Sequence, residues 1–211
     1  MSSERLAPAA VDGPQANAPP RGKLFLLSGP SGSGKSTVIR TALEPKDLPV
    51  RLAVSVTTRA PRQGEIDGLH YHFWPPDKFS AALAAGAFLE WADVYGNRYG
   101  TLRSEVDPYL NLGQSVLLEI DVQGGLQILK SYPDCVSVFI SASGADAYAA
   151  RLRKRQTDSE DSLAKRLAAS RKEQEVGASA YQHQIINDQL PAAVRELRRL
   201  LSFYTGGTHV G

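Results

Sequence analysis

KLFLLSGPSGSGKS, residues 23–36, joins a short apolar run to a turn that contains three glycines. The apolar run at residues 23–28 predicts a buried strand, of the kind found in parallel sheets that helices cover on both faces. Residues 35–43 predict a helix that stops before Pro45, because the residue before a proline disfavours helical geometry. A strand, a glycine-rich turn and a helix in this order are the context in which the G-x-x-x-x-G-K-[ST] motif binds phosphate.

The motif contains the groups that a nucleoside triphosphate requires. Glycines let successive backbone N–H groups face phosphate oxygens, and the helix N-terminus adds its positive end. We expect Lys35 to reach the terminal phosphates of ATP and the Ser36 hydroxyl to bind Mg²⁺. A flexible Gly/Ser loop is the alternative, and the flanking strand and helix argue against it. The ATP contacts predicted here are Gly29, Pro30, Ser31, Gly32, Ser33, Gly34, Lys35, Ser36 and Thr37.

The composition is that of a globular domain and excludes several classes of protein. The chain has 211 residues, and its net charge of +2 gives no bulk electrostatic reason to bind nucleic acid or an anionic membrane. No stretch approaches the ~18 consecutive apolar residues of a membrane span. The single cysteine, Cys135, excludes an internal disulfide and fits a reducing compartment. We therefore expect a cytoplasmic protein, with residues 1–21 disordered and residues 206–211 a flexible tail.

The rest of the chain alternates predicted strands and helices. Further strands are expected at residues 51–56, 71–74, 88–95, 115–121, 136–140 and 184–186. Further helices are expected at residues 77–85 (capped by Asp77), 123–131, 145–154, 159–176 and 191–203. This alternation predicts an α/β fold with a parallel sheet core and helices on both faces, plus a small mixed insert.

A second cluster of polar residues lies between residues 55 and 124. It comprises Ser55-Val-Thr-Thr-Arg59-Ala-Pro-Arg62, Gly64-Glu65, Tyr71, Phe88-Leu-Glu90-Trp91-Ala92, Gly96-Asn-Arg-Tyr99-Gly100-Thr101 and Glu119-Ile-Asp121-Val-Gln-Gly124. Taken together, these motifs resemble guanylate kinases, and the resemblance runs from about residue 23 to residue 203. It implies the P-loop nucleoside monophosphate kinase fold, with a mixed α/β insert that binds the monophosphate and a helical lid. It also implies transfer of the γ-phosphoryl group of Mg-ATP to GMP, and to dGMP.

The resemblance assigns an acceptor site whose chemistry is consistent. Arginine binds phosphate oxygens bidentately and tyrosine hydroxyls complete the cage. A carboxylate at Glu90 can accept hydrogen bonds from the ring N–H and the exocyclic amine of guanine, a pair of donors that adenine lacks. The alternatives to a GMP-binding role are that the arginines are solvated, that the aromatic residues only pack, and that the glutamate is exposed. The residues that the resemblance assigns to GMP are Ser55, Arg59, Arg62, Tyr71, Glu90, Tyr99, Thr101 and Asp121.

Residues 151–167, RLRKRQTDSEDSLAKRL, resemble the lid of the family. The resemblance implies that Arg155 and Arg166, with Arg151 as a third, stabilise the charge on the migrating phosphoryl group. The alternative is the charged face of an amphipathic helix, and Arg153 and Lys154 are assigned to it.

Three further residues carry resemblance-based expectations. Asn187 and Asp188 follow the last predicted strand and resemble the loop near the adenine of ATP, with a plain Asn-Asp turn as the alternative. Glu119 stands where the family commonly has aspartate, and we expect it near Mg²⁺ or Lys35.

These expectations divide the chain into a core (22–54, 103–145 and 167–205), a GMP-binding insert (55–102) and a lid (146–166). The predicted catalytic residues are Lys35, Arg62, Arg155 and Arg166. Two rival functions remain at this point: an inactive guanylate-kinase-like module that binds phosphopeptides, and a P-loop kinase that acts on a phosphorylated sugar. The sequence leaves open whether the protein is a monomer or a homodimer.

Overall fold

The computed structural model describes residues 20–94, 96–144 and 172–206. The predicted lid lies outside these ranges, and so do its arginines, Arg151, Arg155 and Arg166. The predicted helix at residues 145–154 also lies outside them.

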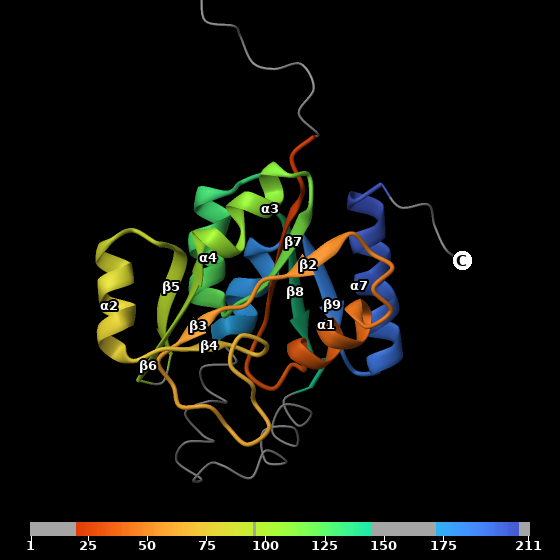
Figure 1. Ribbon diagram of the computed structural model, residues 1–211. Coiled ribbons are helices and arrows are strands. Elements are labelled where there is room, and N and C mark those ends of the chain that lie inside the picture. The colour runs from red at the N-terminus through yellow and green to blue at the C-terminus, as the bar shows by residue number, and fades with distance from the viewer. Residues whose placement is uncertain (1–19, 95, 145–171, 207–211) are drawn as a thin grey trace, which may run out of the picture.

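A five-stranded parallel sheet forms the centre of the molecule, in the order β2-β7-β1-β8-β9 (Figure 1). Its strands are β1 (Leu24–Ser28), β2 (Val50–Leu52), β7 (Ser115–Glu119), β8 (Val136–Ser141) and β9 (His183–Ile186). The strand that precedes the glycine-rich turn, β1, lies in the middle with a partner on each side. The predicted parallel α/β core is therefore confirmed.

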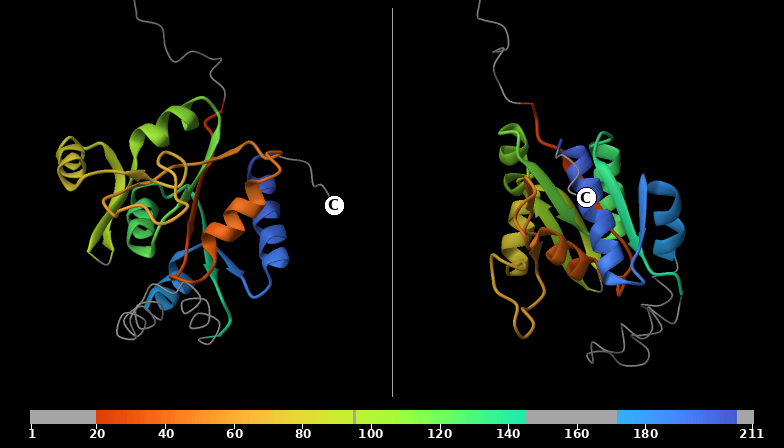
Figure 2. Two further views of the ribbon diagram at one scale, coloured as in Figure 1. Left: turned by 60° about the horizontal axis from the view of Figure 1, so that its bottom comes forward. Right: turned by 90° about the vertical axis from the view of Figure 1, so that its right-hand side faces the viewer.

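Helices cover both faces of this sheet because the side chains of each strand alternate between them. Leu24 and Leu26 of β1 pack in the cluster on the side of α3 (Asp107–Asn111) and α4 (Val122–Ser131). The alternate residues, Phe25 and Leu27, pack in the cluster on the side of α1 and α7. Figure 2 shows α1 (Lys35–Leu43) and α7 (Leu190–Tyr204) side by side on one face. A helix at residues 172–180 covers the other face next to α4.

A second, four-stranded mixed sheet has the order β4-β3-β6-β5. Its strands are β3 (Val56–Thr57), β4 (His72–Phe73), β5 (Phe88–Val94) and β6 (Asn97–Leu102). The helix α2 (Pro76–Ala84) packs on it through Phe79, whose ring stacks on Phe88 with centroids 4.4 Å apart. This unit is the small mixed insert that the sequence predicted.

Several element boundaries differ from the sequence predictions. The strand expected at residues 51–56 is divided: β2 ends at Leu52, the Val54 N–H donates to Glu105, and the backbone passes to β3 in the other sheet. Asp77 does not cap α2, because Pro75 occupies the cap position and Pro76 begins the helix. The strand β6 was not predicted, since its sequence, NRYGTL, has little apolar character, nor were α3 and the short 3₁₀ turn η1 (Arg103–Glu105).

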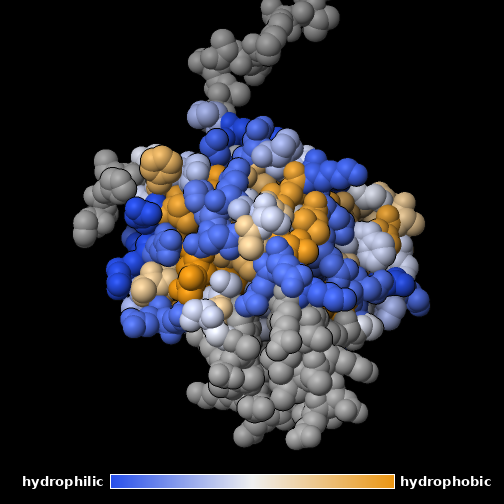
Figure 3. Space-filling view, turned by 180° about the vertical axis from the view of Figure 1, so that it is seen from behind, coloured by the Kyte–Doolittle hydropathy of each residue, from blue (hydrophilic) through white to orange (hydrophobic). Residues whose placement is uncertain are grey.

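No helix in the described ranges is long and apolar enough to cross a bilayer. On the face opposite to that of Figure 1, hydrophobic residues form separate patches among hydrophilic ones (Figure 3).

Candidate active site

The glycine-rich turn is held in shape from two sides. Gly32 and Gly34 adopt left-handed φ angles of 88° and 87°, which residues with a Cβ atom rarely adopt. The Lys35 ammonium donates to the carbonyl oxygens of Gly29 (2.5 Å) and Pro30 (3.1 Å). From the end of β9, the buried Asn187 amide donates to the Ser33 carbonyl at 2.8 Å. The turn therefore leads into the N-terminus of α1 in a fixed shape that suits a phosphate group.

A cavity of about 210 Å³ joins this turn to the second sheet. Residues that are far apart along the chain meet in this cavity. From the sequence, they were assigned to two different ligands, ATP and GMP. The predicted residues that line it are Gly29, Ser31, Gly32, Gly34, Lys35, Ser36, Ser55, Arg62, Tyr71, Glu90, Tyr99, Glu119 and Asp121.

Other predicted residues support the cavity without lining it. Thr101 is fully buried and its hydroxyl lies 3.3 Å from that of Ser55. Asp188 accepts a hydrogen bond from the Ser143 backbone N–H. The predicted residues outside the lining are Pro30, Ser33, Thr37, Arg59, Thr101, Asn187 and Asp188.

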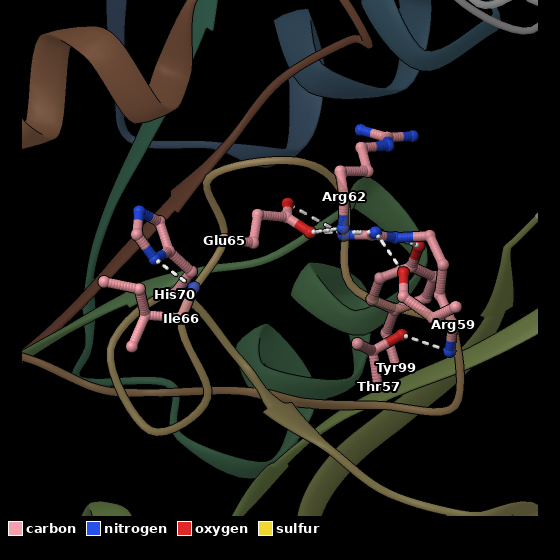
Figure 4. A network of polar contacts seen from close by, with 8 residues as sticks. Thr57, Arg59, Arg62, Glu65, Ile66, His70 and Tyr99 are labelled. Atoms are coloured by element: carbon pink, nitrogen blue, oxygen red, sulfur yellow. Dashed lines mark hydrogen bonds and ion pairs between the residues drawn. The ribbon is translucent and has the colours of Figure 1, made fainter.

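Arg59 is fixed by a network of polar contacts in the loop between β3 and β4 (Figure 4). Its guanidinium makes two hydrogen bonds to the Glu65 carboxylate, at 2.9 and 3.0 Å, and its Nε donates to the Tyr99 hydroxyl at 3.2 Å. Glu65 also accepts from the Arg62 backbone N–H at 2.7 Å. The Arg62 side chain extends away from this network (Figure 4). The two arginines are thus fixed relative to each other by one carboxylate.

The pKa of Glu65 reflects these contacts. Burial works to raise it, but the hydrogen bonds from Arg59 and from the Arg62 backbone outweigh burial and lower it. The carboxylate is consequently held in its charged form, which strengthens both of its bonds.

Glu90 lines the cavity, and its pKa shifts in the opposite direction to that of Glu65. The residue is 3% exposed, and burial raises its pKa to about 7, opposed by a hydrogen bond from Thr101 and reinforced by the charge of Asp121. Within the part of the chain that the structure describes, its Oε1 atom is buried and has no hydrogen-bond partner. A buried acceptor without a partner is costly, so this atom is suited to a ligand that donates a hydrogen bond.

Tyr71 and Tyr99 both line the cavity, and their ring centroids lie 5.9 Å apart. Burial, with the charge of Glu119 as the next cause, raises the pKa of Tyr71 to about 12. Its hydroxyl therefore keeps its proton and can donate it in a hydrogen bond to an anionic group.

Two side-chain oxygen atoms that could bind a metal ion lie at the predicted magnesium position. The Ser36 hydroxyl donates to Oε1 of Glu119 at 2.5 Å, and both residues line the cavity beside Lys35. Mg²⁺ prefers oxygen ligands and keeps several sites for water and substrate phosphate, so one or two protein oxygens suffice. The residues present therefore fit a magnesium ion that arrives with a nucleotide.

Two acidic residues close to the predicted ligands had no role in the sequence predictions. Glu65 lies six residues after Arg59 and three after Arg62, and an acid so close to two expected phosphate ligands was a usable signal. Glu173 lines the cavity from the helix at residues 172–180 and accepts a hydrogen bond from the Ser31 backbone N–H. Burial raises the pKa of Glu173 against the opposing charge of Lys35. No sequence signal singles it out, because the fold alone brings it to the phosphate loop.

Comparison with known proteins agrees with this geometry. The family model described as guanylate kinase matches residues 21–204. The guanylate kinase of Sphingopyxis alaskensis is 45% identical over 182 residues, 86% of this chain and 82% of that protein. The guanylate kinase of Desulfitobacterium hafniense is 41% identical over 85% of this chain and 89% of that protein. Among solved structures, the guanylate kinase of Anaplasma phagocytophilum superposes with a TM-score of 0.72 at 29% identity, over 90% of each chain. A family model that matches residues 21–204 and relatives that are 41–45% identical over about 85% of the chain show that this chain belongs to the guanylate kinase family.

Proposed function

We propose that this protein is a guanylate kinase that transfers the γ-phosphoryl group of Mg-ATP to GMP, and also to dGMP, giving ADP and the nucleoside diphosphate. The observation that carries the proposal is the buried carboxylate of Glu90, with one oxygen lacking a protein partner, in the same cavity as the phosphate loop. A sugar acceptor has no purine edge for such a carboxylate to read, whereas guanine offers two donors to it.

On the donor side, we assign the phosphates of ATP to the backbone of residues 29–37 and to Lys35. Lys35 has to exchange its bonds with the Gly29 and Pro30 carbonyls for bonds with phosphate oxygens. Asn187 and Asp188 stay assigned to the adenine end. A magnesium ion held by Ser36, with Glu119 beside it, would neutralise charge on the phosphates.

On the acceptor side, we assign the GMP phosphate to Arg59, Arg62, Tyr71 and Tyr99. These side chains offer cationic forks and hydroxyl donors, the groups that bind a phosphate dianion. The base is assigned to Ser55, Glu90, Thr101 and Asp121.

The proposed reaction is a direct in-line transfer. A GMP phosphate oxygen is already anionic, so it needs no general base to attack the γ-phosphorus. Catalysis then consists of positioning the two nucleotides and stabilising charge by Lys35, Arg62 and the lid arginines Arg151, Arg155 and Arg166. Closure of the lid (146–166) and the insert (55–102) on the core would exclude water that otherwise hydrolyses ATP.

We also propose a cytoplasmic location, which fits a reaction between two soluble nucleotides. The partners are small molecules, with no nucleic acid and no membrane among them, and the protein acts as a monomer or a homodimer.

The test is an acceptor panel of GMP, dGMP, AMP, CMP and UMP with Mg-ATP, read as ADP formation in a coupled assay. We expect activity with GMP and dGMP and little with the other three. Activity with none of the five, together with binding of a phosphopeptide, would favour an inactive binding module. If none of the five is an acceptor but a phosphorylated sugar added to the panel gives ADP, the other rival is favoured.

A further inference from the structure

The helix α4 is attached to the strand that carries Glu90. β5 is an edge strand of the second sheet, so the backbone of Trp91 is available to a side chain on its outer side. The Gln127 amide of α4 donates to the Trp91 carbonyl at 2.7 Å and accepts from the Trp91 N–H at 3.4 Å. This paired contact fixes α4 at the residue next to Glu90.

Gly124, one turn earlier on α4, lies against the Glu90 carboxylate. Its backbone N–H donates to Oδ1 of Asp121 at 2.9 Å and so belongs to the cap of the helix. A Cβ atom at this position would lie within 3.0 Å of Glu90 Oε2 and 3.1 Å from Glu90 Cδ. Any residue other than glycine would therefore displace the carboxylate.

Glu90 has little freedom to move elsewhere. It is 3% exposed, it interacts with Thr101 on one side, and the charge of Asp121 repels it on another. A carboxylate buried near a second carboxylate remains in place only where the surrounding atoms leave no better position. The position of this group is consequently set by the space above Gly124.

We propose that Gly124 is a positioning residue for acceptor specificity: its missing side chain holds open the position in which the Glu90 carboxylate reads guanine, and Gln127 fixes α4 at that distance. The inference rests on the proposed function. The residue acts through Glu90, so its effect belongs to recognition of the base and not to the transfer step.

The readout is discrimination between GMP and inosine monophosphate, which lacks the exocyclic amine. In the parent, the Glu90 carboxylate, with its Oε1 atom unpartnered, lies where the two donors of guanine can meet it, so GMP is preferred. In Gly124→Ala the displaced carboxylate no longer meets both donors. We expect the KM for GMP to rise roughly tenfold or more, which corresponds to the loss of one such hydrogen bond. The KM for ATP should stay within about twofold, and the preference for GMP over inosine monophosphate should fall.

Three further variants separate positioning from general damage. Gly125→Ala, at the next residue, would overlap Tyr181 and Ser28 instead of Glu90, so it should lower the melting temperature without changing the preference. Glu90→Asp in the Gly124→Ala background shortens the acid by one methylene and should recover part of the preference. Gln127→Met removes the amide bonds to Trp91 and should weaken the preference while leaving the space at Gly124 intact, so it tests the inference even if Gly124→Ala does not fold.

The outcomes distinguish the inference from the function on which it rests. A parent that phosphorylates GMP while Gly124→Ala and Gln127→Met keep its full preference overturns the role of Gly124. A parent that does not phosphorylate GMP overturns the proposed function first, and the inference with it.

Discussion

Glu90 is a buried carboxylate that works against stability. Burial, the larger cause, and the charge of Asp121 raise its pKa to about 7, while the hydrogen bond from Thr101 recovers only part of this shift. Between about pH 4.5 and pH 7 the folded protein keeps a proton that the unfolded chain has already released. The contribution of Glu90 to stability is therefore most favourable below about pH 4.5 and is lost as pH rises through 7.

Glu90→Gln removes this pH dependence. We expect the free energy of unfolding of the variant, minus that of the parent, to increase by roughly 2–3 kcal/mol between about pH 5 and pH 8. Urea denaturation at the two pH values measures it. Glu196, exposed on α7, gives a control for removing a carboxylate from the surface (Glu196→Gln). A difference that does not change with pH would contradict the buried, raised-pKa state of Glu90.

At the scale of elements, the loop between β3 and β4 is organised by its own ion pair. Arg59 and Glu65 are both largely buried, with side chains 14% and 17% exposed, and they form two parallel hydrogen bonds. Such a bidentate pair orients a guanidinium before any ligand arrives and so lowers the entropy cost of binding.

Glu65→Gln should therefore weaken GMP binding at the proposed acceptor site. The amide cannot accept both arginine N–H groups, and the bond to the Arg62 backbone is weakened as well. We expect the KM for GMP to rise roughly tenfold, with the KM for ATP changed less than about twofold. Steady-state kinetics with each substrate varied in turn measures both.

The matched control is Asp47→Asn, which weakens the ion pair of Asp47 with Arg198 outside the cavity. It should leave both KM values unchanged. If Glu65→Gln behaves like this control, the pair does not orient the acceptor site.

At the scale of the whole molecule, the phosphate loop depends on a residue 154 positions away in the chain. Asn187 follows β9 and is held beside β8, because its backbone N–H donates to the Ser141 carbonyl at 2.7 Å. Its side-chain amide donates to the Ser33 carbonyl in the loop. The loop is thus fixed by the far end of the core sheet as well as by its own glycines.

Asn187→Ala would leave the Ser33 carbonyl without the amide that fixes it. We expect a loss of stability of about 1–3 kcal/mol and a several-fold higher KM for ATP, with the KM for GMP nearly unchanged. Gln182→Ala is the control, since it removes the bond from the Ser137 N–H on the same pair of strands away from the loop. It should lower stability without changing the KM for ATP. Equal effects of both variants on this KM would contradict the anchoring role.

Much of the core could be predicted from the sequence because the apolar runs and helix boundaries that define it depend on neighbouring residues. The run at residues 23–28 is apolar on both faces, and residues 35–43 form a helix with the predicted bounds. Boundaries were less predictable where a partner decides them. The backbone leaves the core sheet at Val54 because Glu105, about fifty residues later, accepts its N–H, and β6 forms because β3 and β5 lie on either side of it.

The glycine-rich loop, the parallel core and the identity of the groups at the candidate acceptor site could all be predicted from the amino-acid sequence, because glycines, apolar runs and side-chain chemistry act over a few residues. The tertiary structure decided which of those groups meet. It placed Glu65 on Arg59, Glu173 on the phosphate loop and Gly124 under Glu90, and it left Arg59 outside the cavity lining. It also set the pKa of Glu90, since the protonation of a carboxylate depends on desolvation and on neighbouring charges from other strands and helices.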